Sequence, residues 1–331
     1  MGTCILGHDP IDSCEHFLTA EADLNADHGD DVETLDPGDE FDTPGQANGV
    51  PLQSNRAITE NDITEFRGRF HTKTIVLVGE QKAGKTTLLA TIFGLFCAGP
   101  VGRFSFAGSQ TLLAFAERRH LALEKSKRVS PSTPRTSRAD PVSFFHLCLS
   151  DSTSNNPTNL IISDRSGEAY DDARKNTQLI DKLVELRMAD IVCFLLDAGK
   201  LTDLETRAGY KRKFRETIRA LVDNEALTGT AEIEVLITKL DKLQRKDVEP
   251  SLADDLASYE NELRREFGSR IAFFDIHRIC ALPRANMATG VVGLVEMVER
   301  WCAPDPQIDT RPKPIADAAR HFDRLVEVWA K

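Results

Sequence analysis

Along most of this chain, short apolar runs alternate with longer stretches in which apolar residues recur at helical spacing. Short runs rich in β-branched residues are typical of buried strands, whereas a period of roughly 3.6 residues indicates an amphipathic helix. The pattern predicts strands at Ile75–Val78, Ser143–Leu149, Asn159–Ser163, Ile191–Asp197, Glu234–Thr238 and Ile276–Cys280. It predicts helices at Thr87–Cys97, Thr111–Lys125, Ala173–Met188, Leu201–Val222, Leu252–Phe267 and Val291–Trp301.

Strands that alternate with helices of this length favour an α/β fold, with a doubly wound, mostly parallel sheet covered on both faces. A chain of 331 residues can bury the core of one large α/β domain and still carry appended segments. We expect this domain to span residues 64–303. Residues 99–141 form a long insertion in it, and loops of that length are usually functional or disordered.

The two ends of the chain differ from this domain in composition. Residues 1–55 contain thirteen Asp or Glu and no Lys or Arg, so we expect residues 1–63 to be an acidic, largely disordered segment. At the other end, residues 304–331 begin with a proline-rich linker and continue as an amphipathic helix over Ile315–Lys331.

Four possible zinc ligands occur within the acidic segment. Cysteine and histidine side chains can close a tetrahedral zinc site, but their spacing here matches no standard zinc knuckle. A polar tail that binds no metal is therefore the favoured alternative. The four residues are Cys4, His8, Cys14 and His16.

Charge and cysteine content narrow the function classes. The formal net charge is −11, and removing the thirteen acidic residues of the N-terminal segment leaves about +2, so the domain is near neutral and we expect no nucleic-acid partner. No apolar run approaches the roughly 20 residues of a transmembrane segment, and no signal peptide is recognisable. Seven scattered cysteines indicate reduced thiols, and we expect a cytoplasmic protein.

The strongest functional signal is the phosphate loop, Gly79–Thr86, with the pattern G-x-x-x-x-G-K-T between a predicted strand and a predicted helix. Its glycines let successive N–H groups face a phosphate, Lys85 can reach the β- and γ-phosphate oxygens, and Thr86 can bind Mg²⁺. The predicted nucleotide-binding residues of this region are Gly79, Lys82, Ala83, Gly84, Lys85, Thr86 and Thr87.

Two later strand ends favour GTP over ATP. The third predicted strand runs into D-x-x-G, where Asp164 can support Mg²⁺ and the Gly167 N–H can meet the γ-phosphate. The fifth ends in Thr238-Lys239-Leu240-Asp241, and a carboxylate there can accept two hydrogen bonds from the guanine edge, which adenine does not offer. Cys280 and Ala281, after the sixth strand, can supply a backbone N–H for guanine O6.

These motifs resemble a known family. GEQKAGKT, DRSGE, TKLD and the Cys-Ala pair are similar to the loops of the translation-factor-related class of P-loop GTPases. The FAGS segment after the first helix and the SGE segment after the third strand resemble the bacterial double-GTPase 2 family, over about residues 64–303. The resemblance implies a role in multi-protein bacterial conflict or defence systems, together with GTPase-associated adaptor or effector proteins.

The chain departs from related GTPases at two places. Glu168 follows D-x-x-G where a Gln commonly orients the attacking water, so we expect slow hydrolysis without a partner. The threonine that senses Mg²⁺ and the γ-phosphate has no unique candidate, and Thr133 and Thr136 stay open. Arg135 and Arg138 beside them can serve as an internal arginine finger, although surface arginines are usually only solvated.

Lys82 is the stronger catalytic candidate, because a side chain at the fourth position of the phosphate loop can reach over the oxygen that bridges the β- and γ-phosphates. The alternative is a lysine that is only solvated. The predicted function is a Mg²⁺-dependent GTPase that acts as a regulatory switch or assembly-coupled NTPase. A pseudo-GTPase scaffold with little hydrolysis and an ATP-using signalling ATPase are the alternatives, and homo-oligomerisation stays open. The predicted catalytic residues are Lys82, Lys85, Gly167 and Glu168.

Overall fold

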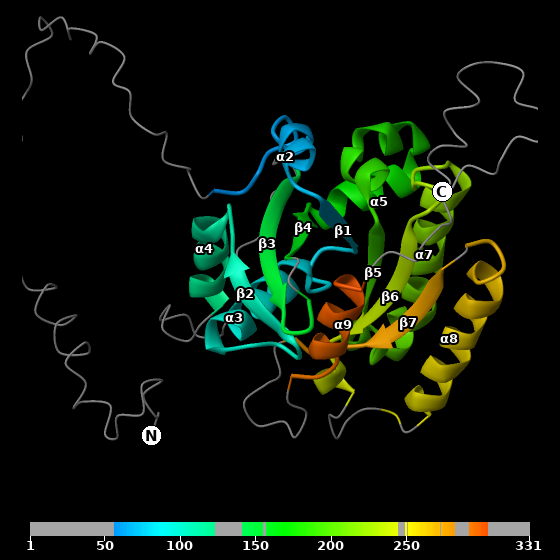
Figure 1. Cartoon of the computed structure of the whole chain (residues 1–331). Coiled ribbons are helices and arrows are strands. Elements are labelled where there is room, and N and C mark those ends of the chain that lie inside the picture. The colour runs from blue at the N-terminus through cyan, green and yellow to red at the C-terminus, as the bar shows by residue number, and fades with distance from the viewer. Residues whose placement is uncertain are drawn as a thin grey trace, which may run out of the picture. The chain divides into compact units, whose positions relative to one another are not determined.

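The computed structural model describes residues 56–122, 141–154, 157–243, 249, 251–271, 273–281 and 291–303. Within them, seven strands form one sheet in the order β2-β3-β4-β1-β5-β6-β7, which Figure 1 shows from one edge to the other. The strands are β1 (Thr72–Val78), β2 (Phe104–Gly108), β3 (Ser143–Asp151), β4 (Thr158–Asp164), β5 (Ile191–Asp197), β6 (Glu232–Thr238) and β7 (Phe274–Arg278).

The strand pairing confirms the mostly parallel sheet that the sequence predicts. β4, β1, β5, β6 and β7 pair in parallel, whereas β3 is antiparallel to both of its neighbours, β2 and β4. Parallel pairing places the carboxyl ends of these strands along one edge of the sheet, where α/β folds bind their ligands. The loops that follow Val78, Asp164, Asp197 and Thr238 therefore leave the sheet side by side.

Helices cover both faces of the sheet and bury two large apolar clusters, as expected of a doubly wound fold. α5, α7 and α8 pack on one face, and α3, α4 and α9 pack on the other. The helical segments are α2 (Ile63–Arg69), α3 (Lys85–Ala98), α4 (Leu112–Ala122), α5 (Gly167–Lys175), α6 (Ala198–Leu201), α7 (Leu204–Asp223), α8 (Leu252–Phe267) and α9 (Leu294–Trp301), with the 3-10 turns η4 (Thr177–Lys182), η5 (Val184–Met188) and η6 (Leu240–Lys242).

The region after β4 is not the single helix predicted for Ala173–Met188. α5 already begins after Ser166, whose side chain accepts a hydrogen bond from the Glu168 N–H. Asn176 ends α5 and starts η4 in a similar way, by accepting from the Gln178 N–H. The prediction was wrong because these two side chains bond to the local backbone, which competes with one continuous helix.

The helix predicted for Leu201–Val222 begins three residues later, as α7, and a separate short helix, α6, ends at Leu201. α6 ends before Asp203, which caps α7 by accepting a hydrogen bond from the Glu205 N–H. An acceptor at this position favours a new helix start, because the first N–H groups of a helix lack partners within it. The buried face of α7 keeps the predicted helical spacing, with Tyr210 and Phe214 one turn apart.

The last strand lies two residues earlier than predicted, and the last helix begins three residues later than predicted. β7 ends at Arg278, and Cys280 lies beyond it in an isolated β-bridge with Val292. α9 starts after Gly293, whose φ of 74° turns the chain into the helix, and not at the predicted Val291. Residues that we predicted to end the strand and to begin the helix are instead joined by the Cys280–Val292 bridge.

Two elements escaped the sequence prediction, α2 and β2. Ahead of β1, Ile58 forms a β-bridge with Phe144, and Ile63 of α2 is buried against β3 and β4. β2 extends the sheet beyond β3, and α4 follows it. The described part of the predicted insertion, residues 99–141, thus adds an edge strand and a helix to the domain.

A buried carboxylate joins α9 to the sheet. Glu234 of β6 is 5% exposed and accepts hydrogen bonds from Arg300 Nε at 2.9 Å and from Trp301 Nε1 at 3.3 Å. The thiol of Cys193 donates to the same carboxylate at 3.7 Å. Because Trp301 is fully buried, loss of this acceptor would leave an indole N–H without a partner in the core.

We expect Glu234→Ala to lower the free energy of unfolding by about 3–5 kcal/mol, because it breaks a buried ion pair and leaves its partners unsatisfied. Urea unfolding followed by circular dichroism measures the change. Glu232→Ala is the matched control, since Glu232 is half-buried on the same face of β6 and should shift the free energy by less than about 1 kcal/mol. Equal effects of the two substitutions would contradict the anchoring role of Glu234.

Candidate functional site

The phosphate loop connects β1 to α3 at the carboxyl edge of the sheet. The chain enters α3 through two residues with positive φ, Lys82 at 67° and Gly84 at 108°, and Ala83 between them is fully buried. A Cβ at Gly79 would lie 3.2 Å from the Ala83 Cβ, a tight contact. The loop is therefore packed into the fold, and the unpartnered N–H groups at the start of α3 can bind an anion.

Lys85 folds back over the phosphate loop. Its Nζ donates to the Gly79 carbonyl at 2.7 Å and to the Glu80 carbonyl at 3.1 Å, and the side chain is only 7% exposed. Burial lowers the pKa of Lys85 to about 8, although nearby carboxylates partly offset this effect. An anionic ligand would stabilise this buried ammonium. Thr87, next but one along the chain, is half-buried in the first turn of α3.

Thr86 and Asp164 form a pair suited to a metal ion. The Thr86 hydroxyl lies 3.2 Å and 3.1 Å from the two oxygens of the Asp164 carboxylate, which is fully buried at the end of β4. A hydroxyl beside a carboxylate is the hard oxygen donor set that Mg²⁺ prefers. These two side chains therefore fit the metal that accompanies a nucleotide triphosphate.

The start of α5 lies directly against the phosphate loop. A Cβ at Gly167 would lie 2.4 Å from the Gln81 nitrogen and 2.4 Å from the Glu80 carbonyl carbon, so only glycine fits. Glu168 follows in the first turn of α5 and is half-buried. The D-x-x-G glycine and the acidic residue after it thus lie next to the loop that carries Lys85.

The connection between β4 and α5 is fixed by a buried ion pair that the sequence did not reveal. Arg165 Nε lies 2.7 Å from Glu185 Oε1, and the Tyr170 hydroxyl donates to the same oxygen at 3.0 Å. Burial raises the pKa of Glu185, even though Arg165 opposes that shift. This contact holds the second residue of D-x-x-G in one place.

Two lysines neutralise a carboxylate of the phosphate loop. Glu80 forms ion pairs with Lys200 of α6 and, at 2.8 Å, with Lys213 of α7. Lys213 also lies 2.8 Å from Asp171 of α5. Burial raises the pKa of Glu80, but the hydrogen bonds and charges of the two lysines outweigh it and hold the pKa below its ordinary value. The network links the phosphate loop to α5, and no sequence motif marks it.

Thr238 and Lys239 donate hydrogen bonds to backbone carbonyls of the phosphate loop. The Thr238 hydroxyl donates to the Ala83 carbonyl at 2.9 Å, and Lys239 Nζ donates to the Lys82 carbonyl at 2.6 Å. Lys239 also donates to the Asp197 carboxylate at 2.6 Å, from a left-handed backbone with φ of 59°. These ties hold the end of β6 against the loop between β1 and α3.

Asp241 and the Cys-Ala pair meet beyond these ties. Asp241 is 2% exposed, and the Cys280 thiol lies 3.7 Å from its Oδ1. The Cys280 N–H donates to the Val292 carbonyl at 3.0 Å, so it is already used. Of the two predicted residues, Ala281 is therefore the one whose N–H can face a base.

An arginine of the insertion also reaches this site. Arg118 of α4 lies with its Nε 3.8 Å from Asp164 Oδ2, the carboxylate that Thr86 also contacts. No motif in the sequence selects Arg118, because its distance along the chain from D-x-x-G follows no fixed spacing. Only the packing of α4 on the fold brings the two charges together.

The other predicted site residues lie outside the described residues. This holds for the two switch threonines, the two arginines beside them, the four possible zinc ligands and the C-terminal helix. The structure therefore adds nothing to those predictions. They are Thr133, Thr136, Arg135, Arg138, Cys4, His8, Cys14, His16 and Ile315–Lys331.

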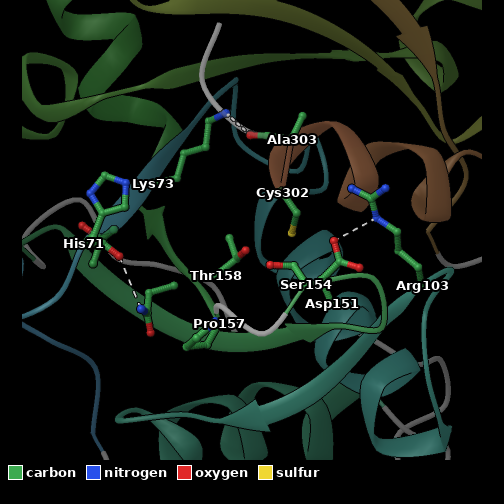
Figure 2. Close-up of a pocket in the computed structure, with 11 residues that line it drawn as sticks. His71, Lys73, Arg103, Asp151, Ser154, Pro157, Thr158, Cys302 and Ala303 are labelled. Carbon is green, nitrogen blue, oxygen red and sulfur yellow. Dashed lines mark hydrogen bonds and ion pairs between the residues drawn. The ribbon is translucent and has the colours of Figure 1, made fainter. Parts of the chain in front are cut away.

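A pocket of about 380 Å³ lies away from this site, at the amino ends of β1 and β4 (Figure 2). Lys73 Nζ donates to the Ala303 carbonyl at 3.1 Å, and Arg103 Nε lies 3.2 Å from Asp151 Oδ2. β1 separates the pocket from the phosphate loop by its full length, roughly 20 Å. The lining charges are paired with protein groups, so we assign the pocket no ligand.

None of the helices in the described part of the chain has the length and apolar content that a membrane span requires. In the same part, no cluster of three or more His, Cys, Asp or Glu side chains is arranged to hold a metal ion. The cysteines that the structure describes are unpaired thiols, namely Cys97, Cys148, Cys193, Cys280 and Cys302.

Comparisons with known proteins give one family match. The family model of Double-GTPase 2 matches residues 73–302, and no curated protein matches the chain. Among solved structures, the signal recognition particle receptor complex SRb-GTP/SRX of Chaetomium thermophilum is 17% identical with a TM-score of 0.36, covering 66% of this chain and 94% of that one. The bacterial selenocysteine-specific elongation factor EF-Sec is 14% identical with a TM-score of 0.33, covering 63% of this chain and 26% of that one.

The family match contains the phosphate loop, the D-x-x-G segment, the Thr238–Asp241 segment and the Cys-Ala pair. It leaves out the acidic N-terminal segment and the residues after Cys302. Because it spans well over half of the 331 residues, this protein belongs to the Double-GTPase 2 family.

Proposed function

We propose that this protein binds GTP with Mg²⁺ and hydrolyses it to GDP and phosphate, as a regulatory switch or an assembly-coupled NTPase. The observation that carries the proposal is the tie of Lys239 to the phosphate loop, at 2.6 Å from the Lys82 carbonyl. It holds the segment that carries Asp241 against the loop that carries Lys85. One nucleotide could therefore place its base at Asp241 and its phosphates at Lys85.

The chemistry at Asp241 favours guanine. A carboxylate accepts two hydrogen bonds from the N1–H and N2–H₂ groups of guanine, and adenine lacks that pair of donors. Because Asp241 is 2% exposed, an adenine there would leave a buried carboxylate with only the weak Cys280 thiol as a donor among the described residues. The Ala281 N–H would bind guanine O6, since the Cys280 N–H is bonded to Val292.

Thr86 and Asp164 would hold Mg²⁺, with Thr133 or Thr136 as the proposed further ligand. The bound metal would neutralise charge on the β- and γ-phosphate oxygens during phosphoryl transfer. Around it, Lys85 would bind the same oxygens, and the Gly167 N–H would bind the γ-phosphate. These roles rest on the 3.1–3.2 Å contacts between Thr86 and Asp164 and on the close approach of Gly167 to the phosphate loop.

Hydrolysis would be slow without a partner. Glu168 can accept a hydrogen bond from water, but its charge opposes the anionic transition state, in which a neutral Gln would help. A nearby cation can compensate for this charge. Lys82 is our proposal for such a cation, because it is exposed at the fourth position of the phosphate loop and its backbone is fixed by Lys239.

The cellular role that we propose is that of a component of a bacterial conflict or defence system, working with adaptor proteins in the cytoplasm. The support for it is the family membership, together with the free thiols that a reducing compartment maintains. A pseudo-GTPase scaffold remains the alternative, favoured by Glu168 and opposed by the intact Lys85, Thr86 and Asp164. An ATP-using enzyme is opposed by the buried Asp241.

We expect Lys85→Ala to weaken GTP binding by roughly 100-fold or more with the fold intact, because it removes the ammonium that the phosphate loop encloses. Calorimetry with purified, nucleotide-free protein measures the affinity, and circular dichroism checks the fold. Lys182→Ala removes an exposed lysine of η4 and is the control. Unchanged GTP affinity in Lys85→Ala would refute the phosphate site.

We expect Asp241→Asn to lose guanine preference and to bind xanthine nucleotides roughly tenfold better than the original chain, since the amide can donate to the xanthine 2-carbonyl. Competition between GTP, XTP and ATP against a fluorescent nucleotide measures the preference. If the unaltered protein binds ATP and GTP equally well, the assignment of Asp241 to the base is wrong.

We expect Lys82→Ala to lower the single-turnover rate of GTP hydrolysis by at least roughly tenfold while GTP affinity changes far less, the pattern of an interaction made in the transition state. Alanine keeps an L-residue at the φ of 67°, so the backbone strain stays the same. Rapid-quench kinetics and calorimetry provide the two measurements. A variant that hydrolyses GTP at the original rate would show that Lys82 is only solvated.

A further inference from the structure

Arg118 brings a third positive charge to the phosphate end of the site, from an element that the family motifs do not include. Its Nε lies 3.8 Å from Asp164 Oδ2, and the Asp164 carboxylate is fully buried. At this distance the two charges form an ion pair but not a hydrogen bond. The Arg118 side chain is 25% exposed, so its guanidinium lies between the core and solvent.

Aromatic packing fixes the direction from which Arg118 approaches. Phe115, one turn earlier on α4, is fully buried, stacks on Phe93 with ring centroids 4.9 Å apart, and contacts Phe145 edge-on at 5.1 Å. The Arg118 guanidinium lies 5.8 Å from the centre of the Phe145 ring. The helix is thus held on α3 and β3, and the arginine stem lies over an aromatic surface that can guide it toward Asp164.

The Nε–H group of Arg118 is a hydrogen-bond donor that the residues described by the structure do not use. In the described part of the chain, the Arg118 Nε–H is buried and has no hydrogen-bond acceptor. An unsatisfied buried donor is costly, and the oxygens of a ligand bound beside Asp164 would supply the acceptor that this donor lacks. Phosphate oxygens are acceptors with the geometry that a guanidinium fits best.

A metal ion at Thr86 and Asp164 would change the balance of charge around Arg118. The guanidinium and the metal are both cations, so they cannot both remain on one carboxylate without mutual repulsion. Thr86 and Asp164 would hold Mg²⁺, and phosphate oxygens bound to the same ion would then lie near Asp164. A small rotation of the Arg118 side chain would bring it to those oxygens.

We propose that Arg118 is the internal arginine of this GTPase: it rests on Asp164 without nucleotide and contacts the γ-phosphate oxygens when Mg²⁺ and GTP bind. The inference rests on the proposed GTPase function. In the reaction, the water oxygen bonds to the γ-phosphorus, the bond to the β–γ bridging oxygen breaks, and its electron pair stays with GDP. The water proton passes to the released phosphate. Arg118 transfers no proton and supplies positive charge to the oxygens at which negative charge collects.

The test compares Arg118→Met with the unaltered full-length chain. Methionine keeps an apolar stem over Phe145 but removes the charge, so the fold should survive. We expect a fall in the single-turnover rate of roughly 10³-fold or more, the effect of an arginine finger, with GTP affinity changed by less than about threefold. Arg118→Lys should restore part of the rate, because it returns the charge without the planar fork.

A second readout does not depend on hydrolysis. Fluoroaluminate bound with GDP and Mg²⁺ mimics the γ-phosphoryl group in the transition state. Transition-state analogues bind far more tightly than substrates when the catalytic charges are in place. A fluorescent GDP should report formation of this complex with the unaltered chain and its loss in Arg118→Met. Arg119→Met is the matched control, since Arg119 lies next along α4, near Gly94, and should change neither readout.

The outcomes separate the inference from the proposed function. A chain that binds no guanine nucleotide refutes the proposed function. A chain that binds GTP but whose Arg118→Met variant still hydrolyses it normally, or still forms the fluoroaluminate complex, refutes the role of Arg118 alone. An unaltered chain that binds GDP and Mg²⁺ but forms no fluoroaluminate complex also counts against Arg118, because the internal cation would then be absent. Equal losses in Arg118→Met and Arg119→Met would indicate a structural effect of α4.

Discussion

The Lys239 ammonium is the contact on which the geometry of this site depends most. It donates to the Lys82 carbonyl and to Asp197, both at 2.6 Å, and so joins the ends of β5 and β6 to the phosphate loop. The parallel sheet makes these three loops neighbours, but sheet pairing alone does not fix the distance between them. Lys239 does so together with the Thr238 hydroxyl, which donates to the Ala83 carbonyl, because a hydrogen bond forms only over a narrow range of distances. Asp241 and Lys85 take their relative positions from this tie.

A second regularity is the balance of charge around the phosphate loop. Two carboxylates at the loop have a cation beside them: Lys200 and Lys213 pair with Glu80, and Arg118 lies near Asp164. Burial would otherwise make such carboxylates costly. Each of these ion pairs joins two different helices, strands or loops. A ligand that draws one of the cations away would therefore change how those two elements contact each other. The tie of Lys213 to Asp171 extends this coupling to α5, the helix that follows D-x-x-G.

The insertion extends the domain on one side only. β2 adds a strand beyond β3, and α4 packs across α3, so the segment that we predicted to be an insertion lies beside the phosphate end of the site. The stacking of Phe115 on Phe93 shows that this segment is packed as a part of the core. A segment so placed can respond to the nucleotide through Arg118 without touching the base.

The sequence by itself determined the fold class and supplied the motifs from which the candidate site was predicted. Apolar runs fixed β5 at Ile191–Asp197, and glycine positions with a lysine fixed the phosphate loop, because both signals are local in the chain. The caps Ser166 and Asp203 moved the starts of predicted helices and Asn176 divided one, because side-chain caps compete locally with helical periodicity.

Only the tertiary structure decided which distant residues meet. Arg118 with Asp164, Glu80 with Lys213 and Glu234 with Trp301 are pairs between elements far apart in the chain. Each partner alone is an ordinary charged or aromatic residue, and no local spacing distinguishes it from a solvated one. These contacts depend on how helices pack across the sheet, which is set by the sum of many apolar contacts and by no single motif.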